Sequence, residues 1–249
     1  MVKGLEHFKK HFSEFTDCYV LIGGTACTLA MNEAGLDFRA TKDLDIVLCI
    51  EVIDKEFGAA FWQFINDGGY EQKQKSTGKK LFYRFYAPTK NDYPEMLELF
   101  SRVPEALKLS DDSHLTPIPI DDEISSLSAI LLDNDYYHFV QLGKREIGGL
   151  SVLVPSHLIP LKARAWIDFS QRHEPNSRDT CKHKNDVVRL YKLLSSNLRI
   201  ELPESIKKDM GIFLDYLKKD ERMDLKNLDL ENTSLDELCN NLGKIYNLV

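Results

Sequence analysis

The chain has 249 residues, of which 43% are hydrophobic and 29% are charged. This composition is typical of a globular protein and excludes an intrinsically disordered one. No apolar run reaches the ~18 residues of a membrane span, and the polar start predicts no signal peptide. The five cysteines are scattered without a Cys-x-x-Cys pair, which argues against disulfides and structural zinc. We therefore expect a cytoplasmic protein without membrane contact.

The charge is unevenly distributed along the chain. A net charge of -7 excludes a generally basic coat for nucleic acids. Residues 156–200 nevertheless carry nine Lys or Arg against four Asp or Glu. This window predicts a local basic surface that could face an acidic site and hold a phosphate-bearing ligand.

The first hundred residues predict helices and strands in alternation, followed by antiparallel strands. The short apolar runs at 18–22 and 43–50 are rich in strand-forming residues. The expected elements are a helix over 5–15, a strand over 18–22, a helix over 25–31 capped by Thr25, a strand over 43–50, a helix over 54–67, and strands over 70–75, 81–86 and 95–100, with a hairpin turn over 76–79. This order predicts an α+β fold around one mixed sheet.

The character of the chain changes near residue 155. Prolines and acidic clusters over 101–135 predict loops with short strands. Strands are expected over 136–142 and 146–154, and helices over 158–171, 179–194, 203–219 and 234–246. The change predicts a mixed-sheet domain over 1–154 and a helical C-terminal domain over 155–249.

An Asp-x-Asp pattern lies in the predicted strand over 43–50. Because side chains alternate along a strand, Asp43 and Asp45 share one face and the apolar residues share the other. Neighbouring carboxylates repel unless a cation lies between them, and two Mg²⁺ ions would relieve that repulsion and form a site for phosphoryl transfer. Glu98, on a later strand, could supply a third carboxylate. The alternative is a strand entry with one capping and one solvated aspartate.

A glycine pair, Gly23-Gly24, separates the first predicted strand from the next helix. A strand followed by two glycines and a helix start leaves free backbone amides, with no Cβ to block a phosphate. Thr25 would add a hydroxyl for a phosphate oxygen. The alternative is that the glycines form only a tight connection.

Several other site types lack their signatures. There is no Gly-x-Ser-x-Gly nucleophile elbow and no Gly-x-x-x-x-Gly-Lys-Ser/Thr phosphate loop. His157, His173 and His183 are too dispersed for a metal-ligand pattern, and we expect them at helix ends or on the surface. The pattern of Asp-x-Asp and Gly-Gly thus remains the informative one.

This pattern resembles the nucleotidyltransferase superfamily that includes DNA polymerase β. Within it, the sequence is most similar to the AbiEii-like nucleotidyltransferases, the toxins of some abortive-infection and toxin–antitoxin systems. The similarity rests on Gly23-Gly24-Thr25-Ala26 and on the run Arg39-Ala40-Thr41-Lys42-Asp43-Leu44-Asp45. It continues at Leu161-Lys162-Ala163 and at Lys182-His183-Lys184-Asn185-Asp186, where Asn185 replaces the family's frequent Asp, and it extends over residues 18 to 195.

The resemblance implies a role for each matching residue. Asp43 and Asp45 would hold two Mg²⁺ ions, and Glu98 would bind the catalytic one. Gly23, Gly24 and Thr25 would hold the β- and γ-phosphates of an NTP. Lys162, Lys184 and Asp186 would line the nucleotide pocket from the helical side; the alternative for the lysines is a solvated helix face.

The resemblance implies a nucleotidyltransferase that moves an NMP from an NTP to an acceptor hydroxyl. It favours RNA as the acceptor, for example a tRNA end, and implies a cognate antitoxin as protein partner. Two alternatives stay open: a non-catalytic nucleotide-binding module of the same fold, and a nucleotidyltransferase that acts on a small molecule.

Overall fold

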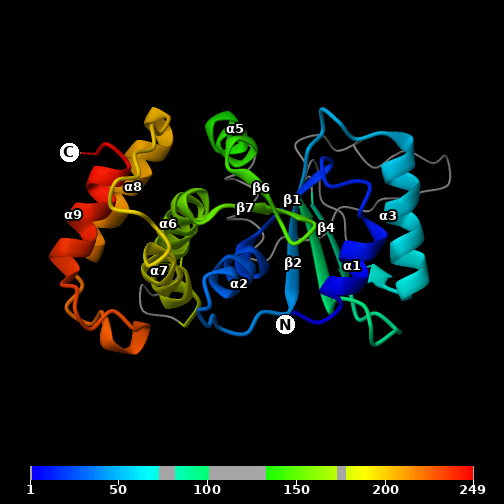
Figure 1. The fold of residues 1–249 in the computed structure, drawn as a ribbon, viewed down its shortest axis with the longest axis horizontal. Helices are drawn as coiled ribbons and strands as arrows, with labels where there is room; N and C mark the ends of the chain where they lie inside the picture. Colours follow the sequence, from blue (N-terminus) through cyan, green and yellow to red (C-terminus); the bar gives the residue numbers. More distant parts are fainter. Residues whose placement is uncertain (1, 73–81, 101–132, 173–177, 249) are drawn as a thin grey trace.

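The computed structural model describes residues 2–72, 82–100, 133–172 and 178–248 (Figure 1). The hairpin turn predicted over 76–79, His173 and the loops predicted over 101–132 lie outside the described residues. Among the described residues, no helix combines the length and apolar character needed to cross a bilayer.

The described strands form one mixed sheet of seven strands in the order β3-β4-β5-β2-β1-β7-β6. Strand β1 pairs antiparallel with β2 and parallel with β7, and β2 pairs parallel with β5. The strands are β1 (Tyr19–Ile22), β2 (Asp43–Leu48), β3 (Glu71–Gln72), β4 (Phe82–Tyr86), β5 (Met96–Phe100), β6 (Lys144–Ile147) and β7 (Leu150–Leu153). The central strands β5, β2 and β1 are thus flanked on both sides, which fixes their register.

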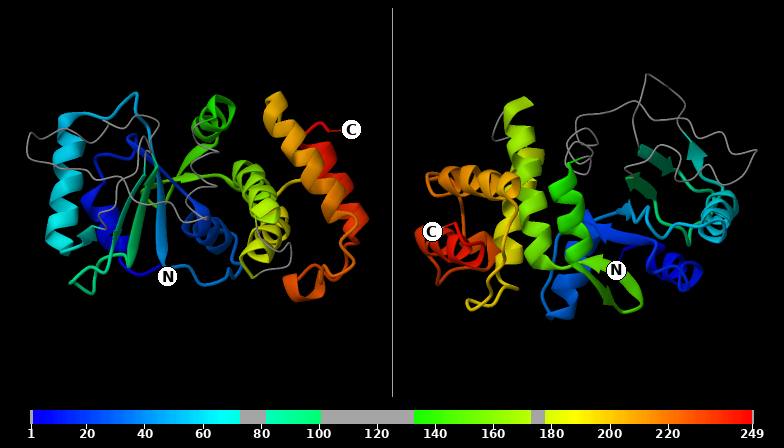
Figure 2. Two further views of the ribbon diagram at one scale, coloured as in Figure 1. Left: turned by 180° about the vertical axis from the view of Figure 1, so that it is seen from behind. Right: turned by 90° about the horizontal axis from the view of Figure 1, so that it is seen from above.

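One side of the sheet is covered by α1 (Leu5–His11) and α3 (Lys55–Gly68), as Figures 1 and 2 show. Aromatic rings join these helices to the strands: Phe8 contacts Tyr19 edge-on at a centroid distance of 5.4 Å, and Phe61 contacts Phe85 at 5.5 Å. Helix α3 begins after the capping residue Asp54 and ends at Gly69, which adopts the left-handed conformation. Leu44 and Ile46 of β2 and Leu97 and Leu99 of β5 therefore face the aromatic layer, whereas Asp43, Asp45 and Glu98 lie on the other face, together with Met96 and Phe100.

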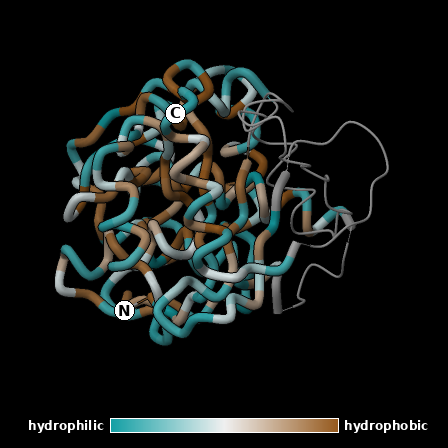
Figure 3. Tube along the Cα trace, turned by 90° about the vertical axis from the view of Figure 1, so that its right-hand side faces the viewer, coloured by the Kyte–Doolittle hydropathy of each residue, from teal (hydrophilic) through white to brown (hydrophobic). Residues whose placement is uncertain are grey.

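The other helices lie on the opposite side of the sheet. They are α2 (Gly23–Glu33), α5 (Asn134–Leu142), α6 (Pro155–Arg172), α7 (Arg178–Tyr191), α8 (Glu204–Leu217), the 3-10 turn η1 (Lys226–Leu228) and α9 (Leu235–Ile245). Helices α6 and α7 pack on each other, and α6 also packs on α2 and α8. Along the chain trace, hydrophobic stretches alternate with hydrophilic ones (Figure 3). The buried hydrophobic residues form one cluster that extends from α1 to α9.

The predicted α+β architecture, a mixed sheet followed by a helical C-terminal region, is confirmed. The change from strands to helices falls between β7 and α6, where the sequence predicts it. The division into domains 1–154 and 155–249 stays a prediction.

Two predicted strands are corrected by the structure. Residues 136–142 belong to helix α5, because Asp133 caps its first turn and its apolar residues recur at helical spacing. Residues 146–154 are not one strand but part of the hairpin β6–β7, which turns at Gly148 and Gly149 with positive φ angles of 58° and 81°.

Asp54→Ala tests the helix signal that begins α3. The Asp54 carboxylate accepts a 2.8 Å hydrogen bond from the amide of Phe57, so its loss should lower the free energy of unfolding by about 1 kcal/mol in urea denaturation. Asp67→Ala, at the exposed end of the same helix, is the matched control and should be neutral or slightly stabilising, since a carboxylate there opposes the helix dipole. Equal losses in the two variants would contradict the capping role.

Candidate active site

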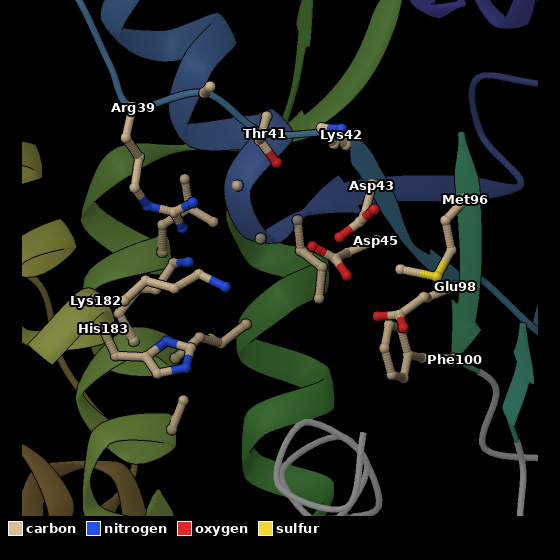
Figure 4. A pocket seen from close by; sticks show the side chains of 18 of the residues that line it. Arg39, Thr41, Lys42, Asp43, Asp45, Met96, Glu98, Phe100, Lys182 and His183 are labelled. Carbon is tan, nitrogen blue, oxygen red and sulfur yellow. The ribbon is translucent and has the colours of Figure 1, made fainter. Parts of the chain in front are cut away.

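Two acidic residues far apart in the sequence become direct neighbours in the sheet. The parallel register of β2 and β5 aligns Asp45 with Glu98, and the antiparallel register of β1 and β2 aligns Ile22 with Asp45. The carboxyl groups of Asp43, Asp45 and Glu98 point toward one another into the same cavity (Figure 4). The sequence-based placement of the three acids on one face therefore agrees with the geometry.

Asp45 and Glu98 are paired in the register of β2 and β5, and their carboxyl groups face each other (Figure 4). Burial, followed by the charge of Asp45, raises the pKa of Glu98 to about 8, and burial also raises the pKa of Asp45. The Arg84 guanidinium on β4 donates a 2.8 Å hydrogen bond from its Nε to Glu98 Oε1. The raised pKa of Glu98 and its pairing with Arg84 therefore both reduce the negative charge at this face.

The donor set fits Mg²⁺, which prefers carboxylate oxygens. Among the described residues, no three His, Cys, Asp or Glu side chains are already arranged around a metal position. Asp45 and Glu98 nevertheless face each other, burial raises the pKa of both, and Asp43 lies two residues away on the same strand face. A divalent cation would favour their charged forms and draw in the third carboxylate.

The start of α2 approaches Asp45 so closely that it requires glycine. Gly23 has a φ of 64°, and a Cβ added there would lie 1.7 Å from Asp45 Oδ2. A Cβ at Gly24 would lie 2.5 Å from Thr41 Oγ1. No side chain caps this helix start, so its first amides point toward the acidic face without a side-chain acceptor. The two glycines thus line the cavity as the sequence predicts.

The predicted role of Thr25 as a helix cap and phosphate ligand is wrong. Thr25 is fully buried within α2, and its Oγ1 donates a 2.7 Å hydrogen bond to the backbone carbonyl of Asp43. Its hydroxyl is therefore already used, and the residue is absent from the cavity lining. Thr25 instead holds the first residue of β2 against α2.

Opposite the acids, Asp186 on α7 forms ion pairs with three cations, Arg39, Lys162 and Arg189. Arg39 donates hydrogen bonds of 2.9 and 2.8 Å to its two carboxylate oxygens, and Lys162 Nζ lies 3.1 Å from Oδ2. Burial alone would raise the pKa of Asp186, but the charge of Lys162 and the hydrogen bonds of Arg39 outweigh it and lower the pKa to about 2. Asp186 is thus a permanent anion that positions Arg39 and Lys162 at the cavity wall.

The structure places Lys184 away from the cavity. Lys184 is buried and forms an ion pair with Asp220, which follows α8. Residues two apart on a helix point in different directions, so Lys182 lines the cavity in its place and its charge acts on Asp45. The predicted pocket role of Lys184 is therefore corrected in favour of Lys182.

The cavity has a volume of about 320 Å³, within the range of small-ligand sites. It has an acidic edge, a basic edge formed by Arg39, Lys162 and Lys182, and an apolar wall that includes Phe100, Leu158, Leu161, Ala165 and Phe169. His183 also lines it, so the prediction of a helix-end or surface position for this residue is wrong. The sequence motif contained Arg39, but only folding brings it to Asp186, 147 residues away.

No known protein family and no curated protein matches the sequence. Among solved structures, an antigenic nucleotidyltransferase-like protein from Paracoccidioides brasiliensis is similar at a TM-score of 0.48 and 14% identity, over 95% of this chain and 98% of that one. JHP933 from Helicobacter pylori is similar at a TM-score of 0.39 and 14% identity, over 98% and 88% of the two chains. These likenesses are too distant to assign an activity.

Gly23→Ala and Gly35→Ala form a matched pair that tests the close approach to Asp45. Both glycines have positive φ, 64° and 70°, but a Cβ at Gly35 meets no atom within 4 Å. Gly35→Ala should therefore cost about 1 kcal/mol of unfolding free energy from backbone strain alone. Gly23→Ala should cost clearly more, because Asp45 must move. Equal losses in urea denaturation would contradict the steric role of Gly23.

Asp186→Asn tests whether the negative charge of Asp186 holds Arg39 and Lys162 in place at the basic edge. The substitution leaves the buried Lys162 and the partly exposed Arg39 and Arg189 without this countercharge and should cost about 3 kcal/mol of unfolding free energy at pH 7. Because the pKa of Asp186 is lowered from 3.8 to about 2, its contribution is complete above pH 4 and disappears as the pH falls toward 2. The gap in Tm between wild type and variant should narrow over that interval in scanning calorimetry.

Asp229→Asn is the control for this measurement, because Asp229 pairs with Lys192 at the exposed surface. It should change Tm little at any pH. If the Tm difference between wild type and Asp186→Asn stays constant from pH 5 to pH 2, the charge of Asp186 is not the cause of the loss of stability.

Proposed function

We propose that the chain is a Mg²⁺-dependent nucleotidyltransferase of the DNA polymerase β type, which transfers an NMP from an NTP to an acceptor hydroxyl. One observation carries the proposal. The sheet register places Asp45 beside Glu98 at the start of α2, and Lys162, Lys182 and Arg39 line the same cavity. Carboxylates for divalent cations and cations for a polyphosphate are what nucleotidyl transfer requires.

The roles of the acidic and glycine residues follow from their positions. Asp43, Asp45 and Glu98 would hold two Mg²⁺ ions, which when bound supply Lewis acidity and lower the pKa of the acceptor hydroxyl. Gly23 and Gly24 leave the first amides of α2 open to the β- and γ-phosphate oxygens. The acceptor oxygen forms a bond to the α-phosphorus. The bond between that phosphorus and the oxygen that bridges it to the β-phosphorus breaks, and pyrophosphate is released.

The basic edge would bind the part of the NTP that becomes pyrophosphate. Lys162 and Arg39 are held in place by Asp186, so they offer charge to the phosphates without a further cost of ordering. Lys182 adds a third positive charge on the same side. Asp186 itself acts as a positioning residue.

We further propose that the acceptor is RNA and that the protein is an AbiEii-like toxin with a cognate antitoxin. The sequence supports this through the matches at Gly23-Gly24-Thr25-Ala26 and Arg39-Ala40-Thr41-Lys42-Asp43. Helices α6 and α7 belong to the basic window over 156–200, and its Lys162 and Lys182 line the cavity, where they would suit a polyanionic acceptor.

A non-catalytic nucleotide-binding module is the second candidate. Its support is the pairing of Arg84 with Glu98, which neutralises one carboxylate without a metal ion. A nucleotide sensor would keep this pairing when it binds an NTP. In an enzyme, Glu98 would have to ligate Mg²⁺ as well as, or in place of, its pairing with Arg84.

Incubation with Mg²⁺ and each α-labelled NTP, in separate tubes with total RNA, a protein lysate or small-molecule extract, distinguishes these functions. Label on RNA supports the proposal, label on protein or small molecules changes the acceptor, and no label in any tube supports the binding module. EDTA should abolish transfer.

The double variant Asp43→Asn/Asp45→Asn should lose label transfer by at least about 10³-fold. Its Tm should be unchanged or higher, because the repulsion between carboxylates is relieved. Asp133→Asn/Asp135→Asn alters the other Asp-x-Asp pattern, at the start of α5, and should keep full transfer. Transfer that survives in the first variant would refute the assignment of the acids.

A further inference from the structure

The apolar part of the cavity ends at one polar side chain, His183. This residue lies on α7 directly after Lys182, and both side chains point into the cavity (Figure 4). Its ring packs against Phe169 at a centroid distance of 5.1 Å. The wall is thus suited to the flat apolar surface of a ligand, and His183 is a polar group within it.

Neither ring nitrogen of His183 has a hydrogen-bond partner among the described residues, although both are buried. Buried polar groups in folded proteins are nearly always hydrogen bonded, so an unpartnered imidazole beside a cavity indicates a group that a ligand completes. Burial, and after it the charge of Lys162, lowers the pKa of His183 well below 6.5. The ring is therefore neutral and carries one donor and one acceptor.

A neutral imidazole suits a different part of the ligand than the lysines do. Phosphates would bind to Lys162, Lys182 and Arg39, which carry full charges. Among the described residues, His183 belongs to no cluster of side chains that could hold a metal ion. The apolar wall and the unpartnered imidazole together fit a heteroaromatic ring whose edge offers one acceptor and one donor.

We propose that His183 binds the nucleobase of the NTP and determines which NTP the protein prefers. The base packs against the apolar wall, and because both ring nitrogens are buried, the imidazole rotates to bring one of them to the edge of the base. The inference rests on the proposed function, since it assumes that the cavity holds a nucleotide. It adds the residue that reads the base to the residues that bind the phosphates.

Equilibrium binding of ATP, GTP, CTP and UTP, measured by calorimetry with Mg²⁺ and without acceptor, tests the inference. The wild type should prefer one NTP over the weakest by about tenfold or more. His183→Phe should weaken the preferred NTP by about tenfold and change the others less than about threefold, so that the preference disappears. His183→Gln retains a donor and an acceptor and should keep a preference.

Lys182→Met is the matched control, because it alters the neighbouring side chain in the same cavity. It should weaken all four NTPs by a similar factor, since every NTP carries the same triphosphate. The Tm of His183→Phe should be unchanged or higher, because the substitution removes two unpartnered buried nitrogens and no hydrogen bond. A lower Tm would indicate a structural role and contradict the inference.

The failures of the inference and of the proposed function can be distinguished. Tight binding of all four NTPs with equal affinity, or equal weakening of all four by His183→Phe, overturns the role of His183 and leaves the nucleotidyltransferase proposal intact. Failure of the wild type to bind any NTP, together with no label transfer, overturns both.

Discussion

The arrangement of the cavity depends on two carboxyl groups that neighbouring parallel strands force together. Asp45 and Glu98 are aligned by register, and neither strand can shift by one residue without turning its apolar side chains away from the aromatic layer. Their repulsion is reduced by the raised pKa of Glu98 and by its pairing with Arg84. In the proposed function, the same surplus of negative charge would give the site its affinity for divalent cations.

A second buried anion, Asp186, connects the sheet to the helical region. It binds Arg39 from the segment before β2 and Lys162 from α6, so one carboxylate orients two cations from distant parts of the chain. A buried ion network is costly unless every member is paired, and this requirement fixes the relative position of α6, α7 and the sheet at the cavity. The acidic and basic edges are thereby held apart across the space where a ligand would lie.

Arg84 and His183 are two residues whose hydrogen bonds would change when a ligand enters the cavity. Arg84 occupies one oxygen of Glu98, which would ligate Mg²⁺ in the proposed function, and His183 has two nitrogens that no described residue satisfies. Both features are consistent with a site that changes its hydrogen bonds when a ligand enters. The Arg84–Glu98 pair affects the charge of the acidic edge, whereas His183 affects the shape and polarity of the apolar wall. The two features therefore act on different parts of the ligand.

The sequence determined most elements, the mixed sheet and the face that carries Asp43 and Asp45. It did so through the periodicity of apolar residues, the capping residues and the glycine pair, because these local signals depend only on neighbours in the chain. Residues 136–142 were predicted wrongly, since tyrosine and valine favour strands while the capping residue Asp133 directs a helix. Only the tertiary structure decided that Thr25 and Lys184 are engaged elsewhere and that Arg39, Lys182 and His183 line the cavity. Which way a helical side chain points at a site depends on the packing of α6 and α7 against α2, and these contacts join residues more than a hundred positions apart.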